Sequence, residues 1–172
     1  MAALNHSSII RYVGFSEIDF KDKPYPTIIL EYAPNGTLKN IIDRENSGLS
    51  HEYWNDTKKL ICIYGIASRM SFLHKNNIIH RDLKPENILM DEFFFPKITD
   101  FGLSKINDSI AESLNTTSQS DYKGTLLYTS PEVFEGCSCS EKSDVYALAL
   151  IVYQIIFIIF FECKLRNHCD GA

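Results

Sequence analysis

The segment from residue 55 to residue 77, NDTKKLICIYGIASRMSFLHKNN, has a periodicity that constrains the fold more than any other part of the chain. Its apolar residues recur at intervals of three and four, the spacing that places side chains on one face of an α-helix. The apolar set consists of Leu60, Ile63, Tyr64, Ala67, Met70 and Leu73, with Lys58, Lys59, Ser68 and Arg69 largely between its members. The pattern predicts a long helix with one apolar face, and Asn76 and Asn77 can supply its C-cap.

Two short runs before this helix predict a pair of β-strands. The runs are IIRYVGF (9–15) and PTIILEY (26–32), which are rich in β-branched and aromatic residues. A charged loop that holds two prolines separates them. The segment APNGTLKNII (33–42) then breaks the second strand at Pro34 and Gly36 and predicts a short helix.

After the long helix, the sequence changes character three times. Residues 78–103 alternate short apolar runs with charged or turn residues, which predicts hairpins. Residues 107–125 are rich in Ser, Thr, Asn and Asp and predict a long polar loop. Residues 145–161 are apolar except for two tyrosine hydroxyls and one glutamine amide, which predicts a helix that is hydrophobic nearly all round. The predicted elements thus include both short strands and helices.

Composition limits the class of protein. A chain of 172 residues with 45% hydrophobic and 23% charged content can bury one core, so one globular domain, or part of one, is expected. A net charge of −5 gives no general attraction for nucleic acid or anionic lipid, so any phosphate must be bound by a local site. Five cysteines without C-x-x-C spacing and the absence of a signal-peptide pattern favour a reducing, cytoplasmic setting. Cys137 and Cys139 are interpreted as surface-loop residues rather than metal ligands.

Three motifs occur in a fixed order along the second half of the chain. His80-Arg81-Asp82 is followed by Lys84 and Asn87, then by Asp100-Phe101-Gly102, and then by Ser130-Pro131-Glu132. This set resembles the catalytic loop (80–87) and the activation segment (100–132) of eukaryotic-type protein kinases. The resemblance implies an α+β, protein-kinase-like fold, ATP and Mg²⁺ as cofactors, and a protein substrate with a Ser or Thr hydroxyl.

Phosphoryl transfer explains why these residue types stand together. The attacking hydroxyl needs a carboxylate to orient it, and the transferring phosphate needs nearby positive charge. Asp82 is the candidate base, and Lys84, two residues on, can neutralise the phosphate. Asn87 and Asp100 supply the oxygen ligands that Mg²⁺ prefers. The resemblance further implies that Thr125 bonds to the base and the lysine.

The family pattern assigns supporting roles to several other residues. His80 and Phe101 would pack in the hydrophobic spine, and Gly102 would give the metal-binding loop its freedom. Arg81 would meet a phosphate carried by the activation segment, and Asp144 would brace the catalytic-loop backbone. The arginine expected to pair with Glu132 has no counterpart in this sequence. Candidate phosphorylation sites in the polar loop are Ser109, Ser113, Thr116, Thr117, Ser118 and Ser120.

The segment IILEYAPNGTL (28–38) resembles the hinge between the two kinase lobes, placed near residues 30–37. Leu30 would be the gatekeeper, and main-chain groups of Glu31 and Ala33 would hydrogen-bond adenine. Leu89 would form the floor beneath the adenine ring. The residues within the motifs most resemble those of the tyrosine-kinase-like group of Ser/Thr kinases.

The resemblance covers residues 4–156, so residues 1–156 are expected to form a partial kinase domain, a remnant of the N-lobe sheet with the first half of the mainly helical C-lobe. Residues 157–172 read as a divergent apolar and basic tail. The sequence contains neither a G-x-G-x-x-G loop nor a lysine in a V-A-I-K context. Three hypotheses stay open: a kinase, a catalytically impaired kinase-like scaffold, and a membrane anchor at 145–161, which the positive-inside rule disfavours.

Overall fold

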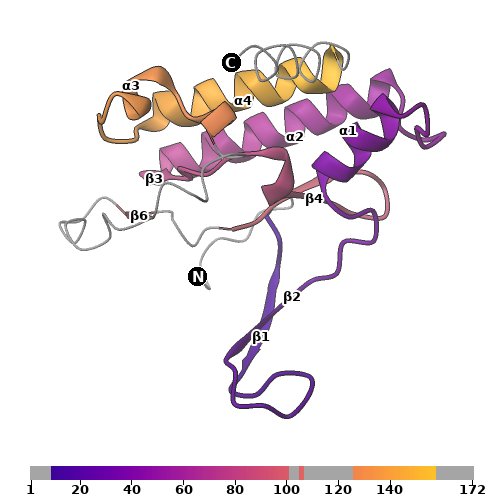
Figure 1. The fold of residues 1–172 in the computed structure, drawn as a ribbon, viewed down its shortest axis with the longest axis vertical. Helices are drawn as coiled ribbons and strands as arrows, with labels where there is room; N and C mark the ends of the chain where they lie inside the picture. The colour runs from indigo at the N-terminus through magenta and orange to yellow at the C-terminus, as the bar shows by residue number, and fades with distance from the viewer. Residues whose placement is uncertain (1–8, 101–104, 107–125, 158–172) are drawn as a thin grey trace, which may run out of the picture.

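The structure, a computed structural model, describes residues 9–100, 105–106 and 126–157. In chain order the elements are β1 (Tyr12–Ser16), β2 (Thr27–Leu30), α1 (Leu38–Asn46), α2 (Asp56–Lys75), β3 (Ile78–Ile79), the 3₁₀ turn η1 (Pro85–Asn87), β4 (Ile88–Met90), β5 (Pro96–Ile98), β6 (Lys105–Ile106), the 3₁₀ turn η5 (Leu126–Tyr128), α3 (Pro131–Phe134) and α4 (Glu141–Ile156). The helices form one layer above the short strands, and the β1–β2 ribbon projects away from both (Figure 1). The α+β prediction is confirmed.

Helix α2 extends over the predicted segment and is capped at both ends. The Asn55 side chain accepts a hydrogen bond from the Lys58 amide (3.1 Å) at the N-terminus. At the C-terminus, the Asn76 side chain donates to the Phe72 carbonyl (2.8 Å). These caps explain why the periodic segment begins and ends as a helix where it does.

The buried face of α2 agrees with the predicted one at Met70 and Leu73 and differs from it elsewhere. Leu60 and Tyr64 are 64% and 75% exposed, whereas Arg69 is fully buried. The face that packs inward is Cys62, Ile66, Met70 and Leu73. Cys62 lies about 200° round the helix from Leu60, so the apolar residues of the segment occupy two faces, and only one of them meets α4 and the strands. Burial lowers the pKa of Arg69 to about 10, and its guanidinium lies 4.7 Å from the Phe72 ring centroid.

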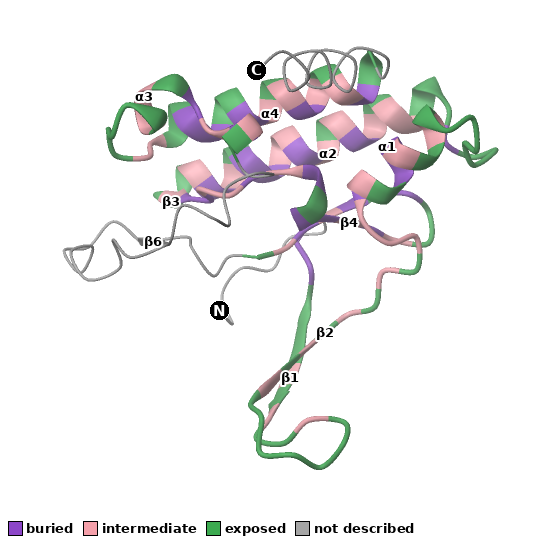
Figure 2. Ribbon diagram, viewed as in Figure 1, coloured by how far each residue is buried: buried purple, intermediate pink, exposed green. Residues whose placement is uncertain are grey.

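Helices α1 and α4 complete the described helical layer. In α1, the Thr37 hydroxyl accepts from the Asn40 amide (3.1 Å), and Leu38, Ile41 and Ile42 are buried. In α4, Ser143, Ala147, Ile151 and Ile155 are buried at every fourth position, and Asp144 is buried beside the first of them. The segment predicted to be hydrophobic all round thus buries one face between 141 and 156 and exposes others (Figure 2).

The strands pair as short antiparallel ribbons. β1 pairs with β2, with an irregularity between Tyr12 and Gly14, and β4 pairs with β5 so that Ile88 faces Ile98. β3 pairs with β6. The hairpin prediction for residues 78–103 therefore agrees with the β4–β5 ribbon, while the partner of β3 lies further along the chain.

Cys137 is exposed and Cys139 is half-buried, and both carry free thiols. Within the described ranges, no helix combines the length and the apolar character that a bilayer crossing requires. Residues 158–161 of the anchor hypothesis lie outside those ranges.

Candidate active site

The backbone of the catalytic loop is fixed by a carboxylate from α4. The main-chain N–H groups of His80 and Arg81 donate to the two oxygens of Asp144, each over 2.9 Å. Asp144 is only 2% exposed, so these charge-assisted hydrogen bonds lie away from water. Arg81 adopts a left-handed conformation with φ +72°, which is uncommon for a residue other than glycine. Asp144 thus holds the loop in a conformation that its sequence alone does not favour.

His74 is part of the same network, although no role was predicted for it from the sequence. Its Nε2 lies 2.9 Å from Asp144 Oδ2, and its side chain is 14% exposed. His74 stands in the last turn of α2, so it links that helix to α4 through the carboxylate that holds the catalytic loop. Its position six residues before His80, at the end of an amphipathic helix, is the only sequence signal that could have drawn attention to it.

His80 is fully buried. Its Nε2 lies 3.1 Å from the Thr99 carbonyl oxygen, which only an N–H can satisfy, so Nε2 carries the proton. Burial lowers the pKa of His80, and the Thr99 carbonyl and the carboxylates of Asp144, Asp82 and Asp100 oppose that shift. The packing role predicted for His80 fits this environment, and its hydrogen bond ties the catalytic loop to the segment that leads to Asp100.

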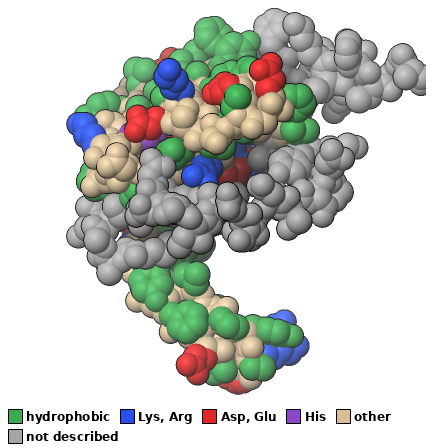
Figure 3. Space-filling view, turned by 90° about the vertical axis from the view of Figure 1, so that its left-hand side faces the viewer, with side chains coloured by type: hydrophobic (Ala, Val, Ile, Leu, Met, Phe, Trp, Pro, Cys, Tyr) green, Lys and Arg blue, Asp and Glu red, His purple; other side chains and the backbone are tan. Residues whose placement is uncertain are grey.

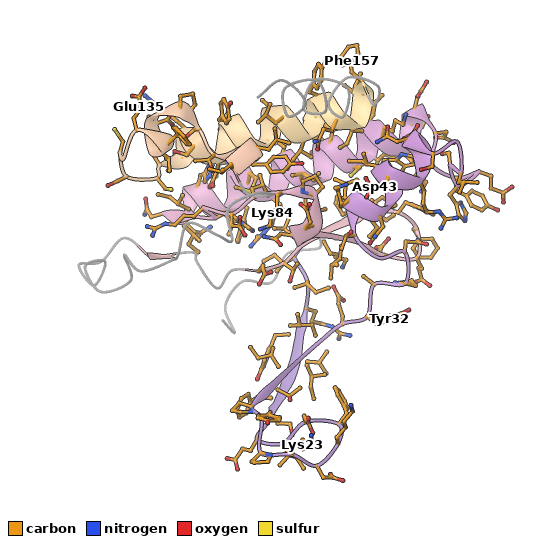
Figure 4. All side chains as sticks on the ribbon, viewed as in Figure 1. Lys23, Tyr32, Asp43, Lys84, Glu135 and Phe157 are labelled. Carbon is orange, nitrogen blue, oxygen red and sulfur yellow. The ribbon has the colours of Figure 1, made fainter. Side chains whose placement is uncertain are left out.

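Two side chains of the catalytic loop converge at the carboxylate of a third, Asp82. Lys84 Nζ lies 2.7 Å from Asp82 Oδ2, and the Asn87 amide donates to the same oxygen (3.0 Å) and to the Asp82 carbonyl (2.8 Å). The Asp82 and Lys84 side chains are 15% and 19% exposed, so they are shielded but reachable. Figure 4 shows Lys84 between the helices and the short strands. The structure therefore brings together the three residues that the motif placed in sequence.

The hairpin β4–β5 places the two candidate metal ligands near one another. The Thr99 amide donates to the Asn87 carbonyl (2.9 Å), so Asp100 follows directly from a residue bonded to Asn87. Because the Asn87 nitrogen donates to Asp82, its side-chain oxygen is the atom left for a cation. Asp100 is exposed and has φ +65°. In the part of the chain that the structure describes, no three His, Cys, Asp or Glu side chains form a metal cluster. One carboxylate and one amide oxygen suit Mg²⁺, which usually shares its coordination with phosphate oxygens and water.

A model of the protein kinase domain matches residues 1–164. The chain belongs to the protein kinase family. It is 33% identical over 155 residues to serine/threonine-protein kinase PknB of Mycobacterium leprae, which covers 90% of this chain and 24% of that protein. It is 38% identical over 143 residues to serine/threonine-protein kinase PKH2 of Candida albicans, with 80% of this chain and 14% of that protein covered.

A third relative is the probable receptor-like protein kinase At5g38990 of Arabidopsis thaliana, 32% identical over 159 residues, with 91% of this chain and 17% of that protein covered. The chain spans less than a quarter of the length of these relatives. The resemblance to eukaryotic-type protein kinases is therefore confirmed, and the placement in the tyrosine-kinase-like group stays a prediction.

The predicted kinase hinge is a turn between β2 and α1. The Asn35 amide donates to the Met90 carbonyl (3.2 Å), and the Met90 amide donates to the Gly36 carbonyl (2.8 Å). Gly36 has φ +70°, and a Cβ there would meet Asn40 Oδ1 at 3.2 Å, so glycine suits the turn. Leu89 pairs with Thr37 and is half-buried. The hinge therefore runs beside the strand that carries the predicted adenine floor, and Leu30, 39% exposed, ends β2 just before it.

Several kinase residues predicted from the motifs lie outside the described ranges, namely Phe101, Gly102, Thr125 and the candidate phosphorylation sites of the polar loop. Glu132 lies within them. Its carboxylate accepts from the Ser143 hydroxyl (3.2 Å), and hydrogen bonds, chiefly from its own amide, lower its pKa. Within the described residues no lysine or arginine forms an ion pair with Glu132.

Proposed function

We propose that this chain carries the phosphoryl-transfer site of a protein serine/threonine kinase, which moves the terminal phosphoryl group of ATP to a protein hydroxyl. The observation that carries the proposal is the contact of Lys84 and Asn87 with the single carboxylate of Asp82, whose loop is held by buried Asp144. Side chains that served only as surface charges would be expected to be exposed to solvent, not shielded in contact with one another.

Each side chain has a distinct task in this proposal. Asp82 orients the substrate hydroxyl and accepts its proton, since the Asp82 carboxylate is the base within reach. Lys84 balances the charge of the transferring phosphoryl group, and its contact with Asp82 holds it ready for that position. Asn87 and Asp100 would hold Mg²⁺, which when bound neutralises charge on the phosphate oxygens.

Nucleotide recognition is assigned to the hinge. The Glu31 amide already donates to the Arg11 carbonyl (2.9 Å), and the Ala33 carbonyl accepts from Gly36 (3.3 Å). The Glu31 carbonyl and the Ala33 amide are thus the proposed partners of the adenine edge, with Leu30 behind the ring and Leu89 beneath it. Thr125 is proposed to support the base, as the family pattern implies.

A second candidate function is that of a kinase-like binding module that does not transfer phosphate. The sequence favours it in one respect, because no G-x-G-x-x-G loop and no V-A-I-K lysine occur among these 172 residues. Loss of one such electrostatic contact to a transition state typically lowers the rate by about 10²–10³-fold. The two candidates predict different results in one assay.

Labelled ATP, Mg²⁺ and casein as a Ser/Thr acceptor provide that assay. We expect transfer that needs Mg²⁺ and that falls about 10²–10⁴-fold in Asp82→Asn, since the general base is lost. Asp43→Asn removes a carboxylate of α1 that is paired with Lys39, and it should leave transfer unchanged. Nucleotide binding without transfer would favour the binding module, and absence of nucleotide binding would overturn both candidates.

A further inference from the structure

The base of the β1–β2 ribbon is the place where the ribbon meets the rest of the protein. The Ile10 amide donates to the Ile98 carbonyl of β5 (3.1 Å), and the Glu31 amide donates to the Arg11 carbonyl (2.9 Å). Lys23, at the far tip of the ribbon, lies well away from Lys84 and the helical layer (Figure 4). The space-filling view shows the ribbon as a narrow arm that leaves the body (Figure 3). Contacts at the base therefore decide how the ribbon and the hinge sit on the body.

The half-buried carboxylate of Glu31 lies at the centre of the contacts where the ribbon joins the body. Glu31 Oε1 lies 3.1 Å from Lys97 Nζ and also accepts from the Arg11 amide (3.1 Å). The Lys97 and Glu31 side chains are 18% and 21% exposed. Arg11 approaches the other oxygen only at 3.8 Å, and its side chain is 76% exposed. Exposed pairs contribute little, so Lys97 is the main cationic partner of Glu31.

Lys97 also stands at a distinctive position in the β4–β5 hairpin. It lies directly opposite Leu89 in the antiparallel register. Opposed residues place their side chains on the same face of a sheet, so Lys97 shares a face with Leu89, the proposed adenine floor. Lys97 lies in β5, three residues before Asp100, which follows the end of that strand. Lys97 thus lies next to the hinge and to Leu89, on the strand that precedes Asp100.

We propose that Lys97 is a positioning residue for the nucleotide, acting through Glu31. Its ammonium group holds the Glu31 carboxylate, and this contact fixes the main chain of residues 31–37 relative to Leu89 and Asp100. A binding site needs its groups held within about 0.5 Å. Backbone hydrogen bonds to Met90 hold the far end of the hinge, and the contact of Lys97 with Glu31 holds the end at the root of the projecting ribbon. The nucleotide part of the inference rests on the proposed function, whereas the ordering of the hinge does not.

Lys97→Met tests the inference because it removes the charge and keeps the apolar stem. Binding of a fluorescent, ribose-labelled ATP to the whole chain should weaken about tenfold, the change expected when the competent hinge conformation falls to about a tenth of the population. Lys97→Arg should restore affinity to within about twofold, since its guanidinium reaches the same carboxylate. Glu31→Gln should match Lys97→Met, and the double variant should be no weaker, because both changes break one contact.

A matched control separates this role from loss of stability. Lys59 forms a similarly shielded pair with Glu45 (2.6 Å, 15% and 18% exposed) far from the hinge, so Lys59→Met should leave nucleotide affinity unchanged. Hydrogen exchange gives a readout that needs no nucleotide: amides of residues 31–37 should exchange faster in Lys97→Met than in Lys59→Met. Equal hinge exchange in these two variants, or equal loss of affinity, would overturn the inference. A parent chain that binds no nucleotide would overturn the proposed function, and the exchange experiment would still decide the role of Lys97.

Discussion

Among single residues, Asp144 joins three polar groups in and beside the catalytic loop. Two backbone amides and the His74 ring nitrogen all approach one carboxylate that is 2% exposed. Each of these groups loses its acceptor if the carboxylate is removed. A buried donor without a partner costs free energy beyond the bond that is lost.

Asp144→Ala is therefore expected to lower the free energy of unfolding by about 3–5 kcal/mol. Urea unfolding followed by circular dichroism measures this loss. Asp43→Ala, at a half-exposed position on α1, should change stability by less than about 1 kcal/mol. An Asp144→Ala chain that unfolds at the parent's urea midpoint would show that the loop does not depend on this carboxylate.

The residues around Asp82 could be predicted from the sequence because they lie close together along the chain. Lys84 and Asn87 lie within five residues of Asp82, so local backbone geometry suffices to bring them together. No role could be predicted for His74 or Lys97 because their partners are distant along the chain. His74 meets Asp144 across 70 residues, and only the packing of α2 on α4 creates that contact.

At the scale of elements, the helical period of the sequence predicted the bounds of α2 well. It was less successful in predicting the face that α2 buries. The 3.6-residue repeat and the asparagine caps are local, and they agree with the observed bounds Asp56–Lys75. Leu60 and Tyr64 were expected inside and are exposed, because apolar residues occur on two faces of the helix. Arg69 was expected to be exposed, but it is buried beside Phe72. This is possible because the long aliphatic stem of arginine can pack against apolar groups.

Helix α4 offers a matched test of its inward face. Ile151 is fully buried, and Ile156 on the same helix is 48% exposed. Ile151→Ala should destabilise the protein by about 2–5 kcal/mol, because it removes buried methylene groups and leaves a cavity. The same change at Ile156 should cost well under half as much, since it vacates little buried volume. Thermal unfolding of both variants measures the difference, and equal losses would contradict the assigned face.

Across the whole molecule, one core cluster joins α1, α2, β4, β5 and α4, and the β1–β2 ribbon contributes nothing to it. The motif order predicted the fold class correctly, because those motifs belong to a family with one known arrangement. Short strands carry too little pattern to be assembled from propensity alone. The pairing of β3 with β6, and the exposure of the ribbon on both faces, followed only from the structure.

Global stability should depend on pH through buried His80. Burial lowers its pKa in the folded state, so below about pH 6.5 the unfolded chain binds a proton that the folded chain does not. Stability should therefore fall as pH decreases from about 6.5, by at most about 1.4 kcal/mol per pH unit for this one proton, until the folded-state pKa is reached.

Urea unfolding at several pH values between 5 and 7 measures this slope. His80→Phe should flatten it, whatever its effect on stability at pH 7. A change at exposed His51, such as His51→Gln, provides the matched control. A slope that is the same in the parent and in His80→Phe would show that His80 is not responsible.

The attachment of the catalytic loop to α4 also bears on the order of folding. The amides of His80 and Arg81 are 64 and 63 residues away along the chain from the carboxylate that fixes them. During synthesis, the loop emerges from the ribosome well before Asp144 does. Closing so long a segment carries an entropic cost, and contacts of high sequence separation form slowly. We therefore expect the catalytic loop to take its final shape late, once α2 and α4 have packed together.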